Sequence, residues 1–446
     1  MPRSRSTRGR LHIVLIPGFA GFDALGQLEY YAGVTPLFQQ WKQSPRHRRN
    51  DVSLHYFDNF PTAAVRTRAT RLRSYLAKRI ARGEFAPNDS VALIGHSTGG
   101  LDIRRLLWEL HEGPDRGYPV DGATLSDHMV TAADILKLIH HVVFLSVPQC
   151  GTNIADWVRT YGLLRRLVIT DLRGGFAGTQ LPIVDTLQQW FWNYFSSTSR
   201  IGIVDAVRDV VSESETMACD NMTQVADAQE AASEVQLWLR HISSDFHAIE
   251  DLSVEGGTDS PARFDDDYRQ KELADWKRSD IVTRSYATVG ARPFKFTAGE
   301  PATRWELINP LSYPEVTPRE RPTPKSDLLY RAAYRACAGG PFVYSNGNVA
   351  PVSKTFFPAN PRPRKIELWD NDGIVNTASM FWPNGDDTLL VECDHLDIVG
   401  HYHEVRSACP GSHRRYQAYD LLKSGSNFSS EGFALVWNDV LDFCVT

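Results

Sequence analysis

Short apolar segments alternate with segments of helical periodicity through the first part of the chain. The apolar segments occupy 11–16, 52–57, 91–94 and 142–147. A short apolar run bounded by turn residues is typical of a strand buried in a parallel sheet. Between these runs, 61–83 and 101–110 each repeat apolar residues along one helical face, which predicts two amphipathic helices. Strands that alternate with such helices indicate a parallel sheet with helices on both faces.

Basic residues crowd the first of these predicted helices. The arginines and lysines from Arg66 to Arg82 fall mainly on the faces that the apolar residues leave free. A run of like charge on a helix is usually a solvated face, so we expect these side chains to be exposed.

The alternation stops at residue 153 and resumes at about 281. Strand character returns at 281–289, 366–369 and 388–393, and the apolar face of 433–441 predicts a final helix. A long insertion in an α/β protein usually covers the C-terminal edge of the sheet, where ligands bind. We therefore expect a core part over 1–152, a helical cap or lid over 153–280 and a second core part over 281–446.

Two stretches within this plan have an unusual composition. The aromatic-rich segment 181–195 is interpreted either as a lid with an apolar underside or as the core of the cap itself. Residues 291–363 contain 12 of the 25 prolines, which rules out long regular elements apart from a short helical piece at 328–337. The length of this excursion suggests a substrate-facing or structural insert rather than a linker.

Composition narrows the class of protein. The 446 residues are 42% hydrophobic and 11% aromatic, which suits a packed globular enzyme, and the net charge of −5 gives no electrostatic reason to expect nucleic acid or an anionic membrane as partner. No run of 18 apolar residues predicts a transmembrane span. The basic residues 1–10 precede an apolar run too short for a secretory signal. We expect a cytoplasmic protein by default, with export by another route left open.

The cysteines indicate neither a metal cluster nor a disulfide framework. None of the six occurs in a C-x-x-C pattern, and they are scattered along the chain. In a chain of this size, free buried thiols are the default interpretation, with a single disulfide bridge as the alternative. The six are Cys150, Cys219, Cys337, Cys393, Cys409 and Cys444.

Residues 95–99 read Gly-His-Ser-Thr-Gly and separate a predicted strand from a predicted helix. In that context the pattern G-x-S-x-G predicts a nucleophile elbow. The two glycines allow a sharp turn where a Cβ would clash with the neighbouring strand or helix. The turn would expose the Ser97 hydroxyl at the C-terminal edge of the sheet, above a helix N-terminus that favours negative charge.

A serine hydroxyl is a poor nucleophile at neutral pH and needs a base. Asp372 and His395 each follow one of the last two predicted strands, so they would meet Ser97 at the same edge of the sheet. The order Ser, Asp, His is that of the α/β-hydrolases. In this interpretation His395 is the base and Asp372 orients it. Asp370 is the competing acid, but Gly373 favours Asp372 because it allows a tight turn that would aim the carboxylate.

Two backbone N–H groups are candidates for an oxyanion hole. Phe19 lies in the glycine-bearing loop after the first predicted strand, and Thr98 follows the nucleophile. N–H groups so placed could stabilise the negative charge that develops during acyl transfer. The alternative for the first loop is an ordinary turn.

Five motifs resemble those of the bacterial true lipases of the thermoalkalophilic and staphylococcal type, and they occur in the order of that family. They are PGFAGF at 17–22, GHSTGG at 95–100, DLSVEG at 251–256, NDGIVNT at 371–377 and DHLDIVG at 394–400. The resemblance implies triacylglycerol lipase activity, a lid over an acyl pocket and the triad of Ser97, Asp372 and His395. This chain departs from the family at Pro17, where the family often has histidine.

The same resemblance implies metal sites. Members of the thermoalkalophilic branch bind calcium through an acidic residue two places after the catalytic histidine, and Asp397 matches it. The alternative role for Asp397 is to cap or brace its loop. These members also bind zinc, and Asp251 matches one zinc aspartate, but no histidine lies between His55 and His96, where its partners would be sought.

We therefore expect a serine carboxylic ester hydrolase, acting on lipid or other carboxylic esters and associating with an oil–water interface. It needs no cofactor for the chemistry itself. The first interpretation is a triacylglycerol lipase. The alternatives are a carboxylesterase for short soluble esters, an acyltransferase and, in a different class, a catalytically silent binding protein with a hydrolase fold.

Overall fold

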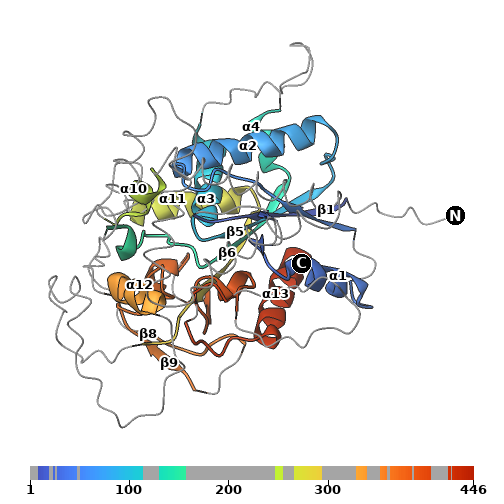
Figure 1. Ribbon diagram of the computed structural model, residues 1–446. Helices are drawn as coiled ribbons and strands as arrows, with labels where there is room; N and C mark the ends of the chain where they lie inside the picture. Colours follow the sequence, from blue (N-terminus) through green and yellow to red (C-terminus); the bar gives the residue numbers. More distant parts are fainter. Residues whose placement is uncertain are drawn as a thin grey trace, which may run out of the picture.

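The computed structural model describes the core of the chain (Figure 1). The described residues are 9–19, 24–25, 28–47, 51–113, 130–156, 247–254, 266–293, 328–338, 352–358, 362–383, 386–402, 420–422 and 424–446.

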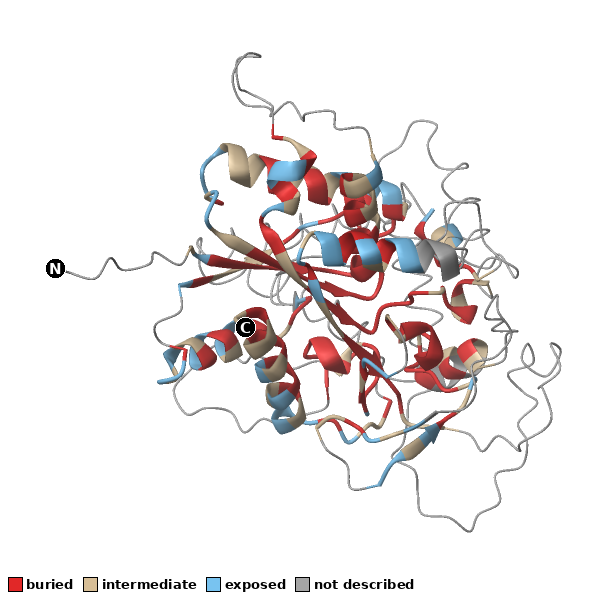
Figure 2. Cartoon of the chain, turned by 180° about the vertical axis from the view of Figure 1, so that it is seen from behind, coloured by how far each residue is buried: buried red, intermediate tan, exposed pale blue. Residues whose placement is uncertain are grey.

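A six-stranded sheet forms the centre of the molecule, in the order β10-β7-β6-β5-β1-β4, and every neighbouring pair is parallel. The strands are β1 (Leu11–Ile16), β4 (Val52–Tyr56), β5 (Ser90–His96), β6 (Ile139–Leu145), β7 (Val282–Thr288) and β10 (Thr388–Val391). Most of their residues are buried (Figure 2), as the apolar runs predict. Since all six strands run in one direction, their C-terminal ends form a single edge.

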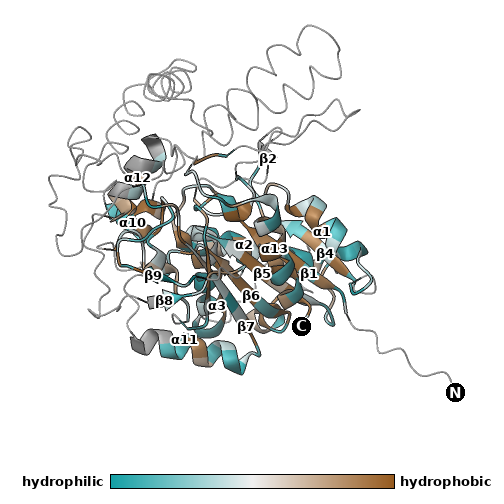
Figure 3. Ribbon diagram, turned by 90° about the horizontal axis from the view of Figure 1, so that it is seen from below, coloured by the Kyte–Doolittle hydropathy of each residue, from teal (hydrophilic) through white to brown (hydrophobic). Residues whose placement is uncertain are grey.

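Helices cover both faces of the sheet (Figure 1). One face carries α2 (Val65–Ala81), α3 (Thr98–Glu112), α4 (Ala132–Leu136) and α11 (Asp266–Arg278), and the other carries α1 (Val34–Gln43) and α13 (Ser430–Cys444). Alternate residues of β1 show the division, since Val14 and Ile16 pack into the first layer and Ile13 and Leu15 into the second. Stretches of teal and brown along α1 and α11 in Figure 3 mark these helices as amphipathic.

Small elements complete the described part. They are β2 (Ala24–Leu25), β3 (Leu28–Glu29), β8 (Val352–Lys354), β9 (Arg364–Ile366), the helices α10 (Ala248–Leu252) and α12 (Leu328–Ala338), and the 3₁₀ turns η2 (Thr377–Met380) and η3 (Asp397–Val399). Among the described residues, no helix is long and apolar enough to cross a membrane.

The predicted strand at 366–369 is wrong in both extent and place. The strand is β9, which ends at Ile366 and pairs antiparallel with β8 outside the central sheet. It ends there because the chain turns at Asp370, whose Oδ2 accepts a hydrogen bond from the Glu367 N–H and whose own N–H donates to the Glu367 carbonyl. The strand that precedes β10 in the sheet is therefore β7.

The ends of two elements, α2 and β6, differ from the predicted ends. The helix expected to open at Pro61 begins at Val65, whose N–H donates to the Asp251 carboxylate at 2.7 Å. The strand expected over 142–147 begins earlier and ends at Leu145, since Ser146 has a positive φ of 51°. Both corrections come from tertiary contacts or local backbone geometry.

The predicted cap lies mostly outside the described residues, as do the aromatic segment 181–195 and most of the proline-rich excursion. The helical piece expected at 328–337 is present as α12. Within the range assigned to the cap, α11 packs against the core, since Trp276 is buried beside Trp382. The three-part division stays a prediction.

Candidate active site

The sharp turn predicted at 95–99 is present, and Ser97 occupies it between β5 and α3. Its backbone has φ 53° and ψ −131°, a conformation that L residues rarely adopt. Both glycines are required by close packing. A Cβ on Gly95 would lie 2.6 Å from the Gly100 nitrogen, and one on Gly99 would lie 2.4 Å from the Ile16 carbonyl oxygen. The turn holds Ser97 at the C-terminal edge of the sheet, where it is 5% exposed.

The first loop, which follows β1, lies directly against Ser97. A Cβ on Gly18 would be 2.5 Å from the Ser97 Cβ, so only glycine fits there without displacement. The Gly18 N–H donates to the Tyr30 hydroxyl at 2.9 Å. Phe19, the next residue, is half-buried against the first helical layer. The loop is thus built into the site, although the role of the Phe19 N–H stays a prediction.

His395 and Asp372 lie side by side at the same edge. The His395 Nδ1 is 2.7 Å from Asp372 Oδ2, and the His395 N–H donates to the Asp372 carbonyl. Because a carboxylate only accepts, Nδ1 carries the proton and Nε2 is left free to accept one. Both side chains are buried, with exposures of 3% and 0%. This is the tautomer that a general base for a serine hydroxyl requires.

The Asp372 carboxylate is fixed by three further donors. The N–H groups of Ile374 and Val375 donate to Oδ1, and the Thr288 hydroxyl donates to Oδ2 at 2.6 Å. Gly373, with φ 96°, makes the turn that brings these N–H groups round, as the sequence predicted. Thr288 is the last residue of β7, so this strand, and not the segment at 366–369, supports the Asp372 carboxylate.

Asp370 has a different environment, which argues against its being the acid. Its carboxylate is fully buried and pairs with Arg292 at 2.5 Å and with Arg364 at 3.4 Å. It also accepts from the Glu367 N–H. A carboxylate with these partners braces the turn before Asp372.

His96 connects the elbow to the His395 loop, a role that sequence reasoning missed. Its Nε2 lies 2.9 Å from the His395 carbonyl oxygen, and its Nδ1 lies 2.6 Å from the Tyr30 hydroxyl. Since the carbonyl only accepts, Nε2 carries the proton and Nδ1 accepts from Tyr30. Burial, with the nearby charge of His395, lowers the pKa of His96 well below its ordinary value, so this ring is neutral. The motif at 95–99 contained His96, but its partners are remote in sequence.

The rings of His96 and His395 lie 4.6 Å apart between centroids. His96, which precedes Ser97, therefore contacts the His395 ring, which is the proposed base for the Ser97 hydroxyl. Among the described residues, hydrogen bonds join His395 to Asp372 and to His96, and none joins His395 to the Ser97 hydroxyl. Catalytic hydrogen bonds are often long until substrate binds.

Three aspartates gather behind the histidine loop. Carboxylate oxygens of Asp394, Asp397 and Asp420 lie within 4.8 Å of one another. Burial, and then the charge of Asp420, raises the pKa of Asp394 to about 7, and burial with the charge of Asp394 raises the pKa of Asp397 well above its usual range. Hard oxygen ligands of this kind fit calcium. The same carboxylates also brace the loop, because Ser424 donates to Asp394 and Ser426 to Asp397.

Asp251 has a structural partner. It accepts the first N–H of α2, from Val65, and so caps that helix at its positive end.

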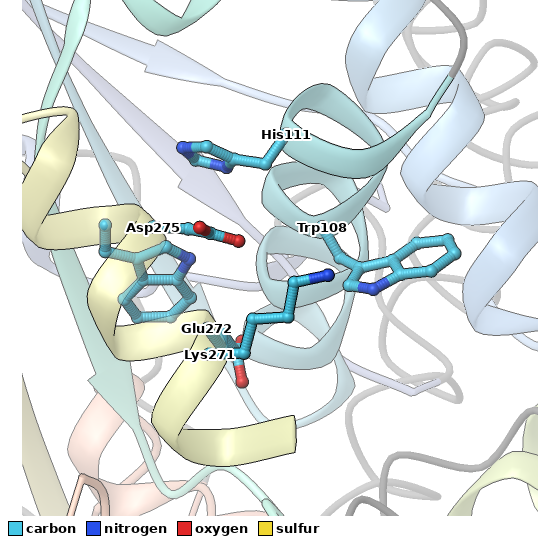
Figure 4. Close-up of a pocket in the computed structure, with 6 residues that line it drawn as sticks. Trp108, His111, Lys271, Glu272 and Asp275 are labelled. Carbon is cyan, nitrogen blue, oxygen red and sulfur yellow. The ribbon is translucent and has the colours of Figure 1, made fainter. Parts of the chain in front are cut away.

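A hollow in the described surface lies away from the candidate triad, between α3 and α11 (Figure 4). It is lined by Trp108, His111, Lys271, Glu272, Asp275 and Trp276. Trp108 and His111 belong to the C-terminal end of α3, whereas Ser97 precedes its N-terminus. The hollow is therefore not the site of Ser97 chemistry.

The parallel sheet, the elbow after β5 and the helices on both faces together define an α/β-hydrolase fold. No protein-family model matches the sequence, and no curated protein matches it. Solved structures are similar in fold. EstA from Clostridium botulinum is 18% identical with a TM-score of 0.41, over 89% of this chain and 85% of that one. Lipase 1 from Pelosinus fermentans is 17% identical with a TM-score of 0.41, over 88% and 94%. The metagenomic carboxyl esterase MGS0156 is 14% identical with a TM-score of 0.39, over 100% and 80%.

Proposed function

We propose that this protein is a serine carboxylic ester hydrolase. Ser97 is the nucleophile, His395 is the general base, and the Asp372 carboxylate orients the His395 ring. The observation that carries the proposal is the His395 ring, which is held by Asp372 on one side and lies against His96 of the elbow on the other. A serine on a strained turn, an imidazole whose Nδ1 is held by a carboxylate, and that orienting carboxylate itself are the parts that acyl transfer needs.

In the acylation step, the Ser97 Oγ attacks the ester carbonyl carbon while His395 Nε2 takes the hydroxyl proton. Asp372 stabilises the imidazolium that results. When the tetrahedral intermediate collapses, the C–O bond to the alcohol breaks and His395 returns the proton to the leaving oxygen. The products of this step are the free alcohol and an acyl-Ser97 ester.

In the deacylation step, water attacks the acyl-Ser97 carbonyl and gives its proton to His395. The second tetrahedral intermediate releases the carboxylic acid, and the proton passes back to the Ser97 Oγ. In both steps the oxyanion is placed toward the N–H groups of Phe19 and Thr98. Removing one such donor typically costs about 10² to 10³ in rate.

Triacylglycerol is the proposed substrate class. The support for this finer assignment is the resemblance of the motifs at 371–377 and 394–400 to the bacterial true lipases. A lid over an acyl pocket and binding at an oil–water interface belong to the same proposal.

We also propose that Asp397 contributes to a calcium site with Asp394 and Asp420. A cation there would neutralise the buried carboxylates of Asp394 and Asp397 and the half-buried carboxylate of Asp420, which otherwise lie close together. Its role would be structural, holding the loop that carries His395, and no chemical step passes through it.

The test uses p-nitrophenyl esters and a fluorophosphonate probe on the wild type and on Ser97→Ala. We expect Ser97→Ala to fold with an unchanged melting temperature, to lose hydrolysis and to lose the adduct. Substantial hydrolysis by the variant, or an adduct elsewhere in the wild type, would refute the assignment of Ser97. A series of acyl chain lengths, with and without an emulsified triacylglycerol, separates a lipase from an esterase for short soluble esters.

A further inference from the structure

Arg68 is fully buried beneath the first loop, contrary to the exposed basic face that the sequence predicted for α2. Its side chain and that of its partner Asp102 are both 0% exposed, and their closest approach is 2.9 Å. A buried guanidinium is retained only where its donors are satisfied, because moving a charge out of water is costly. The acceptors of the Arg68 hydrogen bonds therefore show which segments of the chain this side chain fixes in place.

The five N–H donors of Arg68 meet backbone carbonyls and one carboxylate. Nη2 lies 2.7 Å from the Pro17 oxygen, and both terminal nitrogens lie 3.2 Å from the Gly18 oxygen. The remaining acceptors are the carbonyls of Phe60 and Pro61 and the Asp102 carboxylate. One side chain thus joins the first loop, the segment before α2 and the helix that begins after Ser97.

The Gly18 carbonyl and the Phe19 N–H belong to one planar peptide unit. Fixing the oxygen therefore fixes the direction of the N–H on the opposite side of the same plane. The preceding unit is held at both ends, since the Pro17 oxygen accepts from Arg68 and the Gly18 N–H donates to Tyr30. Within the described part of the chain, the Phe19 N–H donates to no acceptor, so it is free to meet an oxyanion.

The cation also strengthens this donor. A charge-assisted hydrogen bond to a carbonyl oxygen polarises the peptide and makes its N–H more positive, and the effect is larger where water is excluded. Asp102, which also accepts from Asn59 at 3.1 Å, keeps the buried group neutral overall. Asp102 lies on α3, so the loop is held relative to the helix that follows the nucleophile.

We propose that Arg68 is a positioning residue for the oxyanion hole, acting through the Gly18–Phe19 peptide. This inference rests on the proposed function. It adds that the orientation of the Phe19 N–H is imposed by a side chain that touches neither substrate nor Ser97. The competing explanation is a buried ion pair that contributes only to stability.

The test compares Arg68→Met and Arg68→Lys with a matched control, Arg104→Met. Arg104 lies on α3, the helix that carries Asp102. Its side chain is 4% exposed, pairs with Glu272 at 2.7 Å and donates to the carbonyl and side-chain oxygens of Gln149. All variants are assayed well below their melting temperatures. The readouts are kcat, KM and the inhibition constant of an alkyl trifluoromethyl ketone, whose serine adduct carries an oxyanion.

We expect Arg68→Met to lower kcat by about 10² with KM changed less than about threefold, the size of effect seen when an oxyanion donor is lost. The inhibition constant should rise by a similar factor. Arg68→Lys keeps the charge but presents a single nitrogen, so its kcat should lie between wild type and Arg68→Met. Arg104→Met should lower the melting temperature while kcat stays within about threefold.

The inference is overturned if folded Arg68→Met keeps kcat within threefold, or if its kcat and that of Arg104→Met fall equally. If Arg68→Met does not fold, Arg68→Lys decides, and wild-type values of both kcat and the inhibition constant overturn the inference. A wild type without esterase activity would instead remove the proposed function, and the two failures are therefore distinguishable.

Discussion

Asp370 and Asp372 are two residues apart, but their carboxylates contact different partners. Asp372 lies 2.7 Å from His395, whereas Asp370 lies 2.5 Å from Arg292. The same short turn therefore carries one carboxylate that orients a base and one that holds the turn. Substitution of Asp372 should therefore lower activity, whereas substitution of Asp370 should lower stability.

Asp372→Asn should lower kcat by about 10⁴ with little change in melting temperature, because an amide no longer selects the required imidazole tautomer. Asp370→Asn should instead lower the free energy of unfolding by roughly 2 kcal/mol, since it removes the charged acceptor of hydrogen bonds from two half-buried arginines, Arg292 and Arg364. Its kcat, measured on folded protein, should stay within about tenfold. Steady-state kinetics and thermal melts check both, and the opposite pattern would exchange the two roles.

Thr288→Val should lower kcat by about tenfold, because the Asp372 carboxylate loses the hydroxyl donor at 2.6 Å. Thr288→Ser, which keeps the hydroxyl, should retain most of the activity. Ser285 on the same strand is the matched control, since its buried hydroxyl has no hydrogen-bond partner within the described part of the chain. Ser285→Ala should leave kcat unchanged and should not lower the melting temperature. Equal kcat values for Thr288→Val and wild type would show that this hydroxyl is dispensable.

His12 and His55 predict a loss of stability in acid. Their ring nitrogens lie 2.9 Å apart, and His12 also faces Asp89 at 3.1 Å. Burial lowers the pKa of His12, and burial with the charge of His12 lowers the pKa of His55 to about 4. The unfolded state therefore binds more protons between pH 6.5 and about 4, so stability falls as pH falls through this window.

His55→Gln keeps a hydrogen-bonding group beside His12 but does not titrate. We expect its melting temperature to match wild type at pH 8 and to fall less than that of wild type between pH 6.5 and about 4. Thermal melts over a pH series check this. Identical pH dependence in the two proteins would show that His55 does not contribute.

The aspartate cluster predicts the opposite pH dependence without metal. Because the pKa of Asp394 is raised from 3.8 to about 7, the folded state binds more protons than the unfolded state between these two pH values, and stability falls as pH rises through this window. Calcium would remove this cost by neutralising the ionised carboxylates. At pH 8, calcium should therefore raise the melting temperature and a chelator should lower it.

Asp397→Asn supplies the control for calcium. The variant should melt independently of calcium, and in chelator at pH 8 it should be more stable than wild type because one repelled buried carboxylate is gone. Magnesium at the same concentration tests for a general ionic effect. A wild type whose melting temperature ignores both calcium and chelator would leave Asp397 with the loop-bracing role alone.

The elements that the sequence predicted well are those whose signal is local. The apolar run of β1 indicates a buried strand, and the glycines around Ser97 indicate a tight turn. Both signals lie in neighbouring residues, so both elements were placed correctly. A local signal also favoured Asp372 over Asp370, the turn that Gly373 allows, and Asp372 is the aspartate that lies beside His395.

The errors and omissions share a long-range cause. Residues 366–369 have strand composition, but Asp370 closes a turn there. Arg68 looked like one of many solvated arginines, because nothing near it in sequence shows that its acceptors are the carbonyls of Pro17 and Gly18. Thr288 was part of a predicted strand, but only the sheet order places it beside Asp372.

The hydrogen bond between His96 and the His395 carbonyl joins residues 299 apart, and this span has a consequence during synthesis. The ribosome delivers the elbow early, and N-terminal parts generally fold first. The site around the serine is complete only after β10, the loop that carries His395 and α13 have been synthesised. Trp437 of α13 anchors this loop, because its indole N–H donates to the Ile398 carbonyl. A nascent chain therefore holds the proposed nucleophile without its proposed base through most of translation, and the proposed esterase activity should arise only when the last segment docks.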